Sequence, residues 1–188
     1  MQTLPRTPPV SPATEAELET LWGHAEPFPY FLARIRQLRP LWEGTYRNAV
    51  IPAWALEAYG NLPNGLLMLS LNADWCLDSA TVMPLLARLA ERVPGVELRL
   101  LERDSYPEVM DRYLTDGTRS IPLVILLDRD FRELGHWGPR PAELQSWVRA
   151  HLADLPKEER QREQRRWYAR DRGETVLREI LQDLGLRT

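Results

Sequence analysis

The sequence predicts an α/β protein with a three-layer α/β/α core, a mixed sheet of about four strands, and helical extensions at both ends. Two mostly apolar runs, at 66–71 with Ser70 as its polar residue and within 122–128 before Asp128, are typical of strands buried on both faces. A helical apolar pattern follows the first run over 79–92. The predicted order of elements in the middle of the chain is β-α-β-α-β-β-α. The two strands of its first β-α-β unit must be parallel and joined by a right-handed crossover.

Residues 1–60 are predicted to form a proline-rich arm and a helical N-terminal extension. Four prolines within 1–13 favour an extended, mobile arm. Thr14 can cap the first helix, because Glu17 lies three residues later and completes a capping box. Apolar spacing predicts a helix over 29–39, and further helix, interrupted near Pro52, is expected to end at Gly60.

Residues 61–153 are predicted to form the central α/β domain. The strand 66–71 leads into the helix 79–92, and a turn at Pro94-Gly95 leads into an alternating strand over 96–101. A helix opens at Pro107 and extends to about Leu114. The strand 122–128 is followed by a hairpin turn at 128–130, a return strand over 131–137 and an amphipathic closing helix over 144–152.

Residues 154–188 are predicted to form a charged, helical C-terminal extension. The run 157–166 mixes acidic and basic residues, so it indicates a solvated helix with short-range ion pairs rather than a nucleic-acid surface. An apolar stripe follows, and we expect it to be mostly buried on the core or on a second subunit of a homodimer. The stripe consists of Leu177, Ile180, Leu181 and Leu184.

The composition narrows the class of protein further. One cysteine in 188 residues argues against a disulfide-stapled secreted domain, and a net charge of −3 gives no support for nucleic-acid binding. Residues 1–14 lack the apolar segment of a signal peptide, and no apolar run approaches membrane-spanning length. We therefore expect a cytoplasmic protein with no membrane partner.

Cys76 is the central candidate for chemistry, because it lies where the strand 66–71 gives way to the helix 79–92. A helix N-terminus carries partial positive charge, which favours the nucleophilic thiolate over the thiol. Asp74 and Asp78 flank this cysteine, and nearby carboxylates raise a thiol pKa. The sequence leaves open which effect is larger, and a small buried structural cysteine is the alternative.

The segment from Trp75 to Ser79, followed at a distance by Ile121-Pro122 before a buried strand, resembles the thioredoxin superfamily over about residues 64–152. The resemblance implies a cis-proline at Pro122 that faces Cys76, since X–Pro bonds are where a cis peptide is accessible. Three further segments, Arg103-Asp104, 110–117 and 137–141, resemble a bacterial thioredoxin-like branch.

The chain departs from disulfide-reducing thioredoxins at Ser79, which occupies the place of their second cysteine. Because Cys76 is the only cysteine, no intramolecular disulfide can form. Ser79 is either a silent replacement or a hydrogen-bond partner of the Cys76 sulfur. Ser70 stands where the family carries a buried acid that assists proton transfer, which lowers the expectation of efficient dithiol-type chemistry.

We predict two groups of site residues. Cys76 and Ser79 are the candidate catalytic pair, and the candidate substrate-binding residues are Trp75, Asp78, Arg119, Ile121 and Pro122. Arg119 could offset the neighbouring aspartates, hold a substrate carboxylate, or pair with Asp104 or Asp116. For Arg103 and Arg140 a structural ion pair is favoured. The three histidines lack metal-ligand spacing, so no metal or other cofactor is expected.

Two functions remain open from the sequence. In the first, Cys76 is a monothiol nucleophile that exchanges with disulfides or is oxidised, and an external thiol resolves the product. The expected partner is then a low-molecular-weight thiol such as glutathione, or a protein thiol or disulfide. In the second, the fold is a non-catalytic module that binds extended peptides along the Pro122 edge. A purely structural domain in a homodimer is a weaker third reading.

Overall fold

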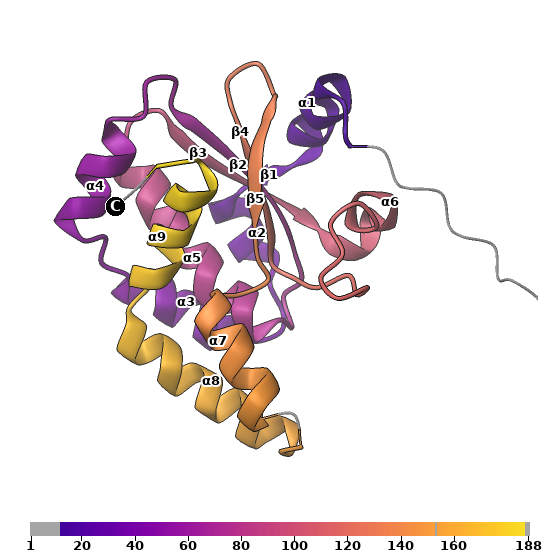
Figure 1. Ribbon diagram of the computed structural model, residues 1–188, viewed down its shortest axis with the longest axis vertical. Coiled ribbons are helices and arrows are strands. Elements are labelled where there is room, and N and C mark those ends of the chain that lie inside the picture. Colours follow the sequence, from indigo (N-terminus) through magenta and orange to yellow (C-terminus); the bar gives the residue numbers. More distant parts are fainter. Residues whose placement is uncertain (1–11, 153, 187–188) are drawn as a thin grey trace, which may run out of the picture.

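The computed structural model describes residues 12–152 and 154–186, so most of the predicted proline-rich arm lies outside the described residues. The five-stranded mixed sheet has the order β1-β3-β2-β4-β5 (Figure 1). Its strands are β1 (Glu26–Pro27), β2 (Leu66–Asn72), β3 (Val96–Glu102), β4 (Leu123–Leu127) and β5 (Glu133–Trp137). The predicted α/β fold is confirmed, with the two-residue β1 added to the four expected strands.

The pairing of the strands follows from their sequences. β2 pairs in parallel with β3 and antiparallel with β4, and every residue of β2 and β4 is buried. Strands covered on both sides read as continuous apolar runs, as these two do. In β3, Val96 and Leu98 are buried while Glu97 between them is exposed, as a half-covered strand requires.

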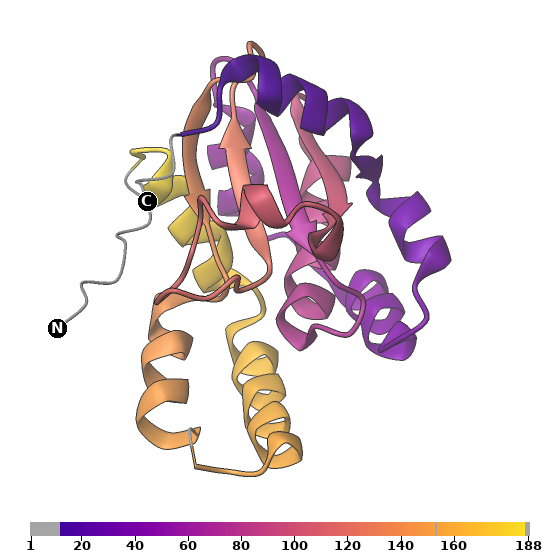
Figure 2. The same cartoon turned by 90° about the vertical axis from the view of Figure 1, so that its right-hand side faces the viewer.

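Helices cover both faces of the sheet (Figures 1 and 2). α1 (Glu15–His24) and α6 (Pro107–Met110) pack on one face with the side chains of Leu67, Leu69 and Ile125. The other face is covered by α2 (Phe28–Arg34), α3 (Arg39–Asn48), α4 (Ala53–Gly60), α5 (Leu77–Arg92) and α9 (Glu174–Asp183). Alternate residues of β2 therefore contribute to two separate cores on opposite faces.

The predicted capping box is present at the start of α1. The Glu17 amide donates to the Thr14 hydroxyl at 3.3 Å, and the Glu17 carboxylate accepts from the Thr14 amide at 2.8 Å. Each contact satisfies a backbone N–H that a helix start leaves unpaired.

The predicted helix over 29–39 is wrong in its extent. α2 ends at Arg34, and α3 begins at Arg39 after Leu38 adopts a left-handed conformation with φ 51°. The Asp74 carboxylate accepts hydrogen bonds from the amides of Arg36 and Gln37, both at 3.0 Å. An acceptor distant in sequence thus stabilises the non-helical linker, and apolar spacing cannot reveal such a contact.

The helix expected from Pro107 to Leu114 is also shorter than predicted, because α6 ends at Met110. The chain then turns, with Asp116 and Gly117 at positive φ. The Tyr113 hydroxyl donates to Glu133 at 2.7 Å and ties this segment to β5.

The C-terminal third adds a helical hairpin beside the sheet. α7 (Ala142–Trp147) continues as the wider helix η2 (Val148–Leu152), and α8 (Lys157–Asp171) returns alongside it (Figure 2). α9 then packs on β5 and buries Leu177, Ile180 and Leu181, while Leu184 is partly buried. The predicted apolar stripe is therefore covered within the chain. Every helix among the described residues is too short or too polar to span a membrane.

Candidate functional site

Cys76 is the N-cap residue of α5 and lies almost entirely beneath the surface, with 8% of its area exposed. Its thiol donates to the Ile121 carbonyl at 3.4 Å, and its sulfur accepts from the Ser79 amide at 3.5 Å. The first contact favours the neutral thiol and the second favours the thiolate.

The predicted juxtaposition of Cys76 with Pro122 is confirmed, and the Ile121–Pro122 peptide is cis. The neighbouring Gly138 explains part of the sequence segment 137–141. A Cβ atom at Gly138 would lie 2.1 Å from the Pro122 carbonyl oxygen, and the φ of Gly138 is +131°. Only glycine therefore allows the loop after β5 to lie this close to the site.

Ser79 is fully buried, and its hydroxyl has no hydrogen-bond partner among the described residues. The hydrogen bond to sulfur comes from the Ser79 backbone instead of its side chain. Ser70 is also buried; its hydroxyl donates to the Leu123 carbonyl at 2.8 Å and accepts from the Asn72 amide at 3.0 Å. Neither serine supplies an ionisable group to the thiol.

Asp78 belongs to a buried network behind the thiol. It is 4% exposed, and its two oxygens accept from the Arg140 guanidinium at 2.7 Å and from the Tyr168 hydroxyl at 2.8 Å. Burial raises the pKa of Asp78, against the opposing effects of Arg140 and Tyr168. Arg140 thus forms a structural ion pair, as favoured, with Asp78 as its partner, and both oxygens of Asp78 accept hydrogen bonds within the protein.

The sequence left open whether the helix start or the flanking aspartates have the larger effect on the pKa of Cys76. Burial and then the Asp78 carboxylate raise the pKa of Cys76, and the polar groups of Ser79 and the Asp78 amide only partly oppose them. Asp74 does not contribute as expected, because its carboxylate is turned to the linker between α2 and α3. Cys76 therefore holds its proton to higher pH than an ordinary thiol.

A cavity of about 380 Å³ opens beside Cys76, Trp75 and Ile121. Its remaining walls carry more basic than acidic groups, because Asp78 is the one acidic residue among the described residues that line it. Five basic residues line it, namely Arg103, Arg119, Arg140, Lys157 and Arg160. Trp75 is 43% exposed, and the Arg103 guanidinium lies 4.9 Å from its ring centre.

Arg119 lines the same cavity as Cys76, but the ion-pair partners expected for Arg119 are wrong. Its guanidinium binds both oxygens of Asp111 at 2.7 Å, instead of Asp104 or Asp116. Asp104 pairs with Arg103 at 2.7 Å, as favoured. Both ion pairs are partly exposed. The Arg103 and Arg119 side chains line the cavity even though each is paired with an aspartate.

The α8 wall of the cavity was missed by the sequence reasoning, which treated the run 157–166 as a solvated face. Lys157, Arg160, Gln161 and Gln164 line the cavity. Their spacing of i, i+3, i+4, i+7 is one face of a helix, and this signal was available in the sequence. Neither Lys157 nor Arg160 forms an ion pair with the residues that the structure describes.

The described part of the chain contains no group of three His, Cys, Asp or Glu residues that could hold a metal ion. His136 lies on β5, and its imidazole nitrogen is 3.4 Å from the Glu133 carboxylate. It does not line the thiol cavity.

Comparison with known proteins places this fold and site in context. No curated protein matches the chain. A crystal structure of a protein of unknown function from Pseudomonas aeruginosa is 20% identical with a TM-score of 0.71, and the match covers 92% of this chain and 98% of the other. An HIV epitope-scaffold is 18% identical with a TM-score of 0.69, covering 89% and 96%. The family model Thioredoxin_9, described as thioredoxin, matches residues 25–160, and the chain therefore belongs to this thioredoxin family.

Proposed function

We propose that this protein is a monothiol thioredoxin-like protein in which Cys76 exchanges with an anionic disulfide and an external thiol completes the reaction. The observation that carries the proposal is the position of the single cysteine. Its sulfur lies at the start of α5, against the Ile121 carbonyl and beside a cavity with cationic walls. The Trp-Cys-x-x-Ser segment is then the defining motif of its branch.

The chemistry proceeds in two exchange steps. The Cys76 thiolate attacks one sulfur of a disulfide, forming a mixed disulfide while the other sulfur leaves as a thiolate with the electron pair of the broken bond. A free thiolate from solution then attacks the substrate-derived sulfur of the mixed disulfide. Cys76 leaves as a thiolate, and a new disulfide is released. Ser79 cannot take the second role, because a hydroxyl is too weakly acidic to expel sulfur.

The cavity favours an anionic substrate. Lys157 and Arg160 lack ion-pair partners among the described residues, and Arg103 and Arg119 add partly exposed cations. A tripeptide thiol with free carboxylates, such as glutathione, fits this chemistry, and guanidinium groups bind carboxylates well. Trp75 offers an exposed apolar surface to the same ligand.

One observation favours a second candidate function, a peptide-binding module without turnover. Burial and Asp78 raise the pKa of Cys76, so the protonated, weakly nucleophilic thiol predominates at neutral pH. The proposed exchange is therefore slow at neutral pH and accelerates as the pH rises through the Cys76 pKa.

The deciding experiment is an intact-mass titration with glutathione disulfide between pH 6 and pH 10, with Cys76→Ser as the control. We expect one glutathione adduct in the wild type, formed faster with rising pH, and none in the variant. Insulin-disulfide reduction with a thioredoxin-reductase system should be negligible. If the folded protein gains no adduct even well above the ordinary thiol pKa, about 8.5, the peptide-binding module replaces this proposal.

A further inference from the structure

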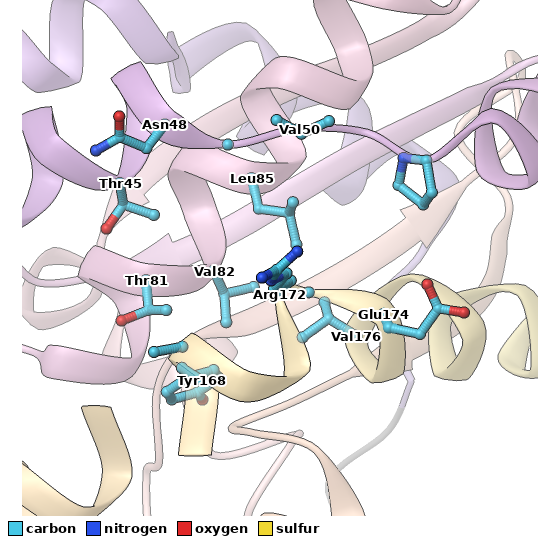
Figure 3. Close-up of a pocket in the computed structure, with 14 residues that line it drawn as sticks. Thr45, Asn48, Val50, Thr81, Val82, Leu85, Tyr168, Arg172, Glu174 and Val176 are labelled. Carbon is cyan, nitrogen blue, oxygen red and sulfur yellow. The ribbon is translucent and has the colours of Figure 1, made fainter. Parts of the chain in front are cut away.

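A second cavity, of about 600 Å³, lies along the middle of α5 (Figure 3), and Cys76 is not among the residues that line it. The end of α3 and its following loop, the middle of α5, and the junction of α8 with α9 enclose it. Its lining is largely hydrocarbon, with Val50, Pro52, Val82, Leu85, Ala169 and Val176 among the contributors. A volume between roughly 300 and 1,000 Å³ is usual for small-molecule sites.

The wall formed by the α8–α9 junction is fixed in place. Gly173 adopts φ +83°, and a Cβ atom there would lie 2.3 Å from a methyl carbon of Leu85. The backbone therefore packs directly on α5 at a position where glycine is required. Tyr168 forms another part of the wall and is anchored by its hydrogen bond to Asp78 at 2.8 Å. The cavity is thus preformed by packed elements.

Two charged residues line this cavity, and they differ in their partners. The Glu174 carboxylate accepts from Arg178 at 2.6 Å and from the Trp54 indole at 3.0 Å, so its charge is already compensated. Arg172 has no hydrogen-bond or ion-pair partner for its side chain among the described residues, and it is exposed to solvent. Figure 3 shows Arg172 among the apolar side chains of α5 and α9.

The backbone at Arg172 is also unusual, because its φ is 55° at the end of α8. Left-handed backbone favours glycine or asparagine at a helix end, although Leu38, Asp116 and Phe131 also adopt it in this chain. Non-glycine residues in this region often belong to functional sites. Arg172 therefore carries its guanidinium at the rim of a largely apolar cavity.

We propose that this cavity is a binding site for a small amphipathic carboxylate, such as an aliphatic acid or an arylalkanoic acid. The carboxylate binds Arg172, and the hydrocarbon body packs against Val82, Leu85 and Val176. A charge-assisted hydrogen bond to one guanidinium sets the orientation, and burial of apolar surface supplies affinity. The site does not use Cys76, so the proposal is independent of the thiol chemistry.

The test is isothermal titration calorimetry of the full chain with octanoate, octanamide and octylammonium, which share one hydrocarbon chain and differ in head group. We expect octanoate to bind with a dissociation constant on the order of 1 mM or tighter, and octylammonium to bind far more weakly. Because Arg172 is exposed, Arg172→Gln should weaken octanoate about two- to fivefold and leave octanamide unchanged.

Three further variants locate the site. Arg170→Gln removes an exposed charge from the same helix end without lining the cavity, so its octanoate affinity should equal that of the wild type. Ala169→Trp fills the cavity from an exposed helix position and should weaken octanoate and octanamide alike. Cys76→Ser should bind octanoate as the wild type does. The proposal is overturned if octanoate does not bind, if Arg172→Gln binds it normally, or if Ala169→Trp does so.

Discussion

The thiol cavity and the second cavity described above are built on the same two helices and differ in chemistry. The thiol cavity uses the first turn of α5 and the first half of α8, which contribute Asp78, Lys157 and Arg160. The second cavity uses the middle of α5 and the end of α8, which contribute Val82, Leu85 and Tyr168. The hydrogen bond between Asp78 and Tyr168 lies between them.

This difference shows how one helix can line two sites. α8 begins with a dense run of charged and amide side chains and carries Trp167, Tyr168 and Ala169 near its end, before Arg170 and Asp171. Long charged side chains keep their ends in water and form a polar wall, whereas Tyr168 is buried against α5. The change in composition along the helix, rather than a change of fold, therefore separates a polar cavity from an apolar one.

Removing Tyr168 should have the largest effect, because it lines the second cavity and hydrogen-bonds to Asp78 of the thiol cavity. Tyr168→Ala deletes a buried ring, and a large-to-small change of this kind costs about 3 to 5 kcal/mol of stability. Tyr168→Phe keeps the ring and removes only the partner of Asp78, so it should cost about 1 to 3 kcal/mol. Urea denaturation measures both. Equal losses for the two variants would show that the ring does not support the packing described here.

A charge change at Asp78 should affect the thiol cavity alone. Asp78→Asn removes the carboxylate that raises the Cys76 pKa and leaves Arg140 nearby, so at pH 8 more of the thiol is ionised. Alkylation by iodoacetamide should become several-fold faster, and its pH profile should move to lower pH.

The matched control is Asp74→Asn, which keeps an acceptor for the amides of Arg36 and Gln37 and should leave the alkylation profile unchanged. A shift in this control as large as in Asp78→Asn would contradict the assignment of the Cys76 pKa to Asp78.

The smallest expected effect concerns the α8 wall. Arg160→Gln should slow adduct formation with glutathione disulfide by about two- to fivefold at low ionic strength, since exposed charges contribute at most about 1 kcal/mol. The effect should shrink at high salt, and alkylation by neutral iodoacetamide should not change. Arg165→Gln removes a charge from α8 outside the cavity and is the control. Equal slowing in the two variants would indicate a general charge effect.

The α/β architecture could be predicted because its signals are local. Apolar runs predicted β2 and β4, and apolar residues at helical spacing predicted α5. The capping box predicted the start of α1. The juxtaposition of Cys76 with Ile121-Pro122 was also predictable, because the family resemblance supplied the pairing of two distant segments. The extents of α2 and α6 were not, because Asp74 and Glu133 stabilise non-helical backbone from far along the chain.

The sequence by itself determined the identity of the thiol, its place at a helix start and the absence of a second cysteine. These properties depend on residue type and on neighbours within a few positions. Only the tertiary structure decided the surroundings of the thiol, since α8 and Arg140 approach it from more than 60 residues away. Burial and charge act through space, so the pKa direction of Cys76 and the lining of both cavities became visible only in the folded chain.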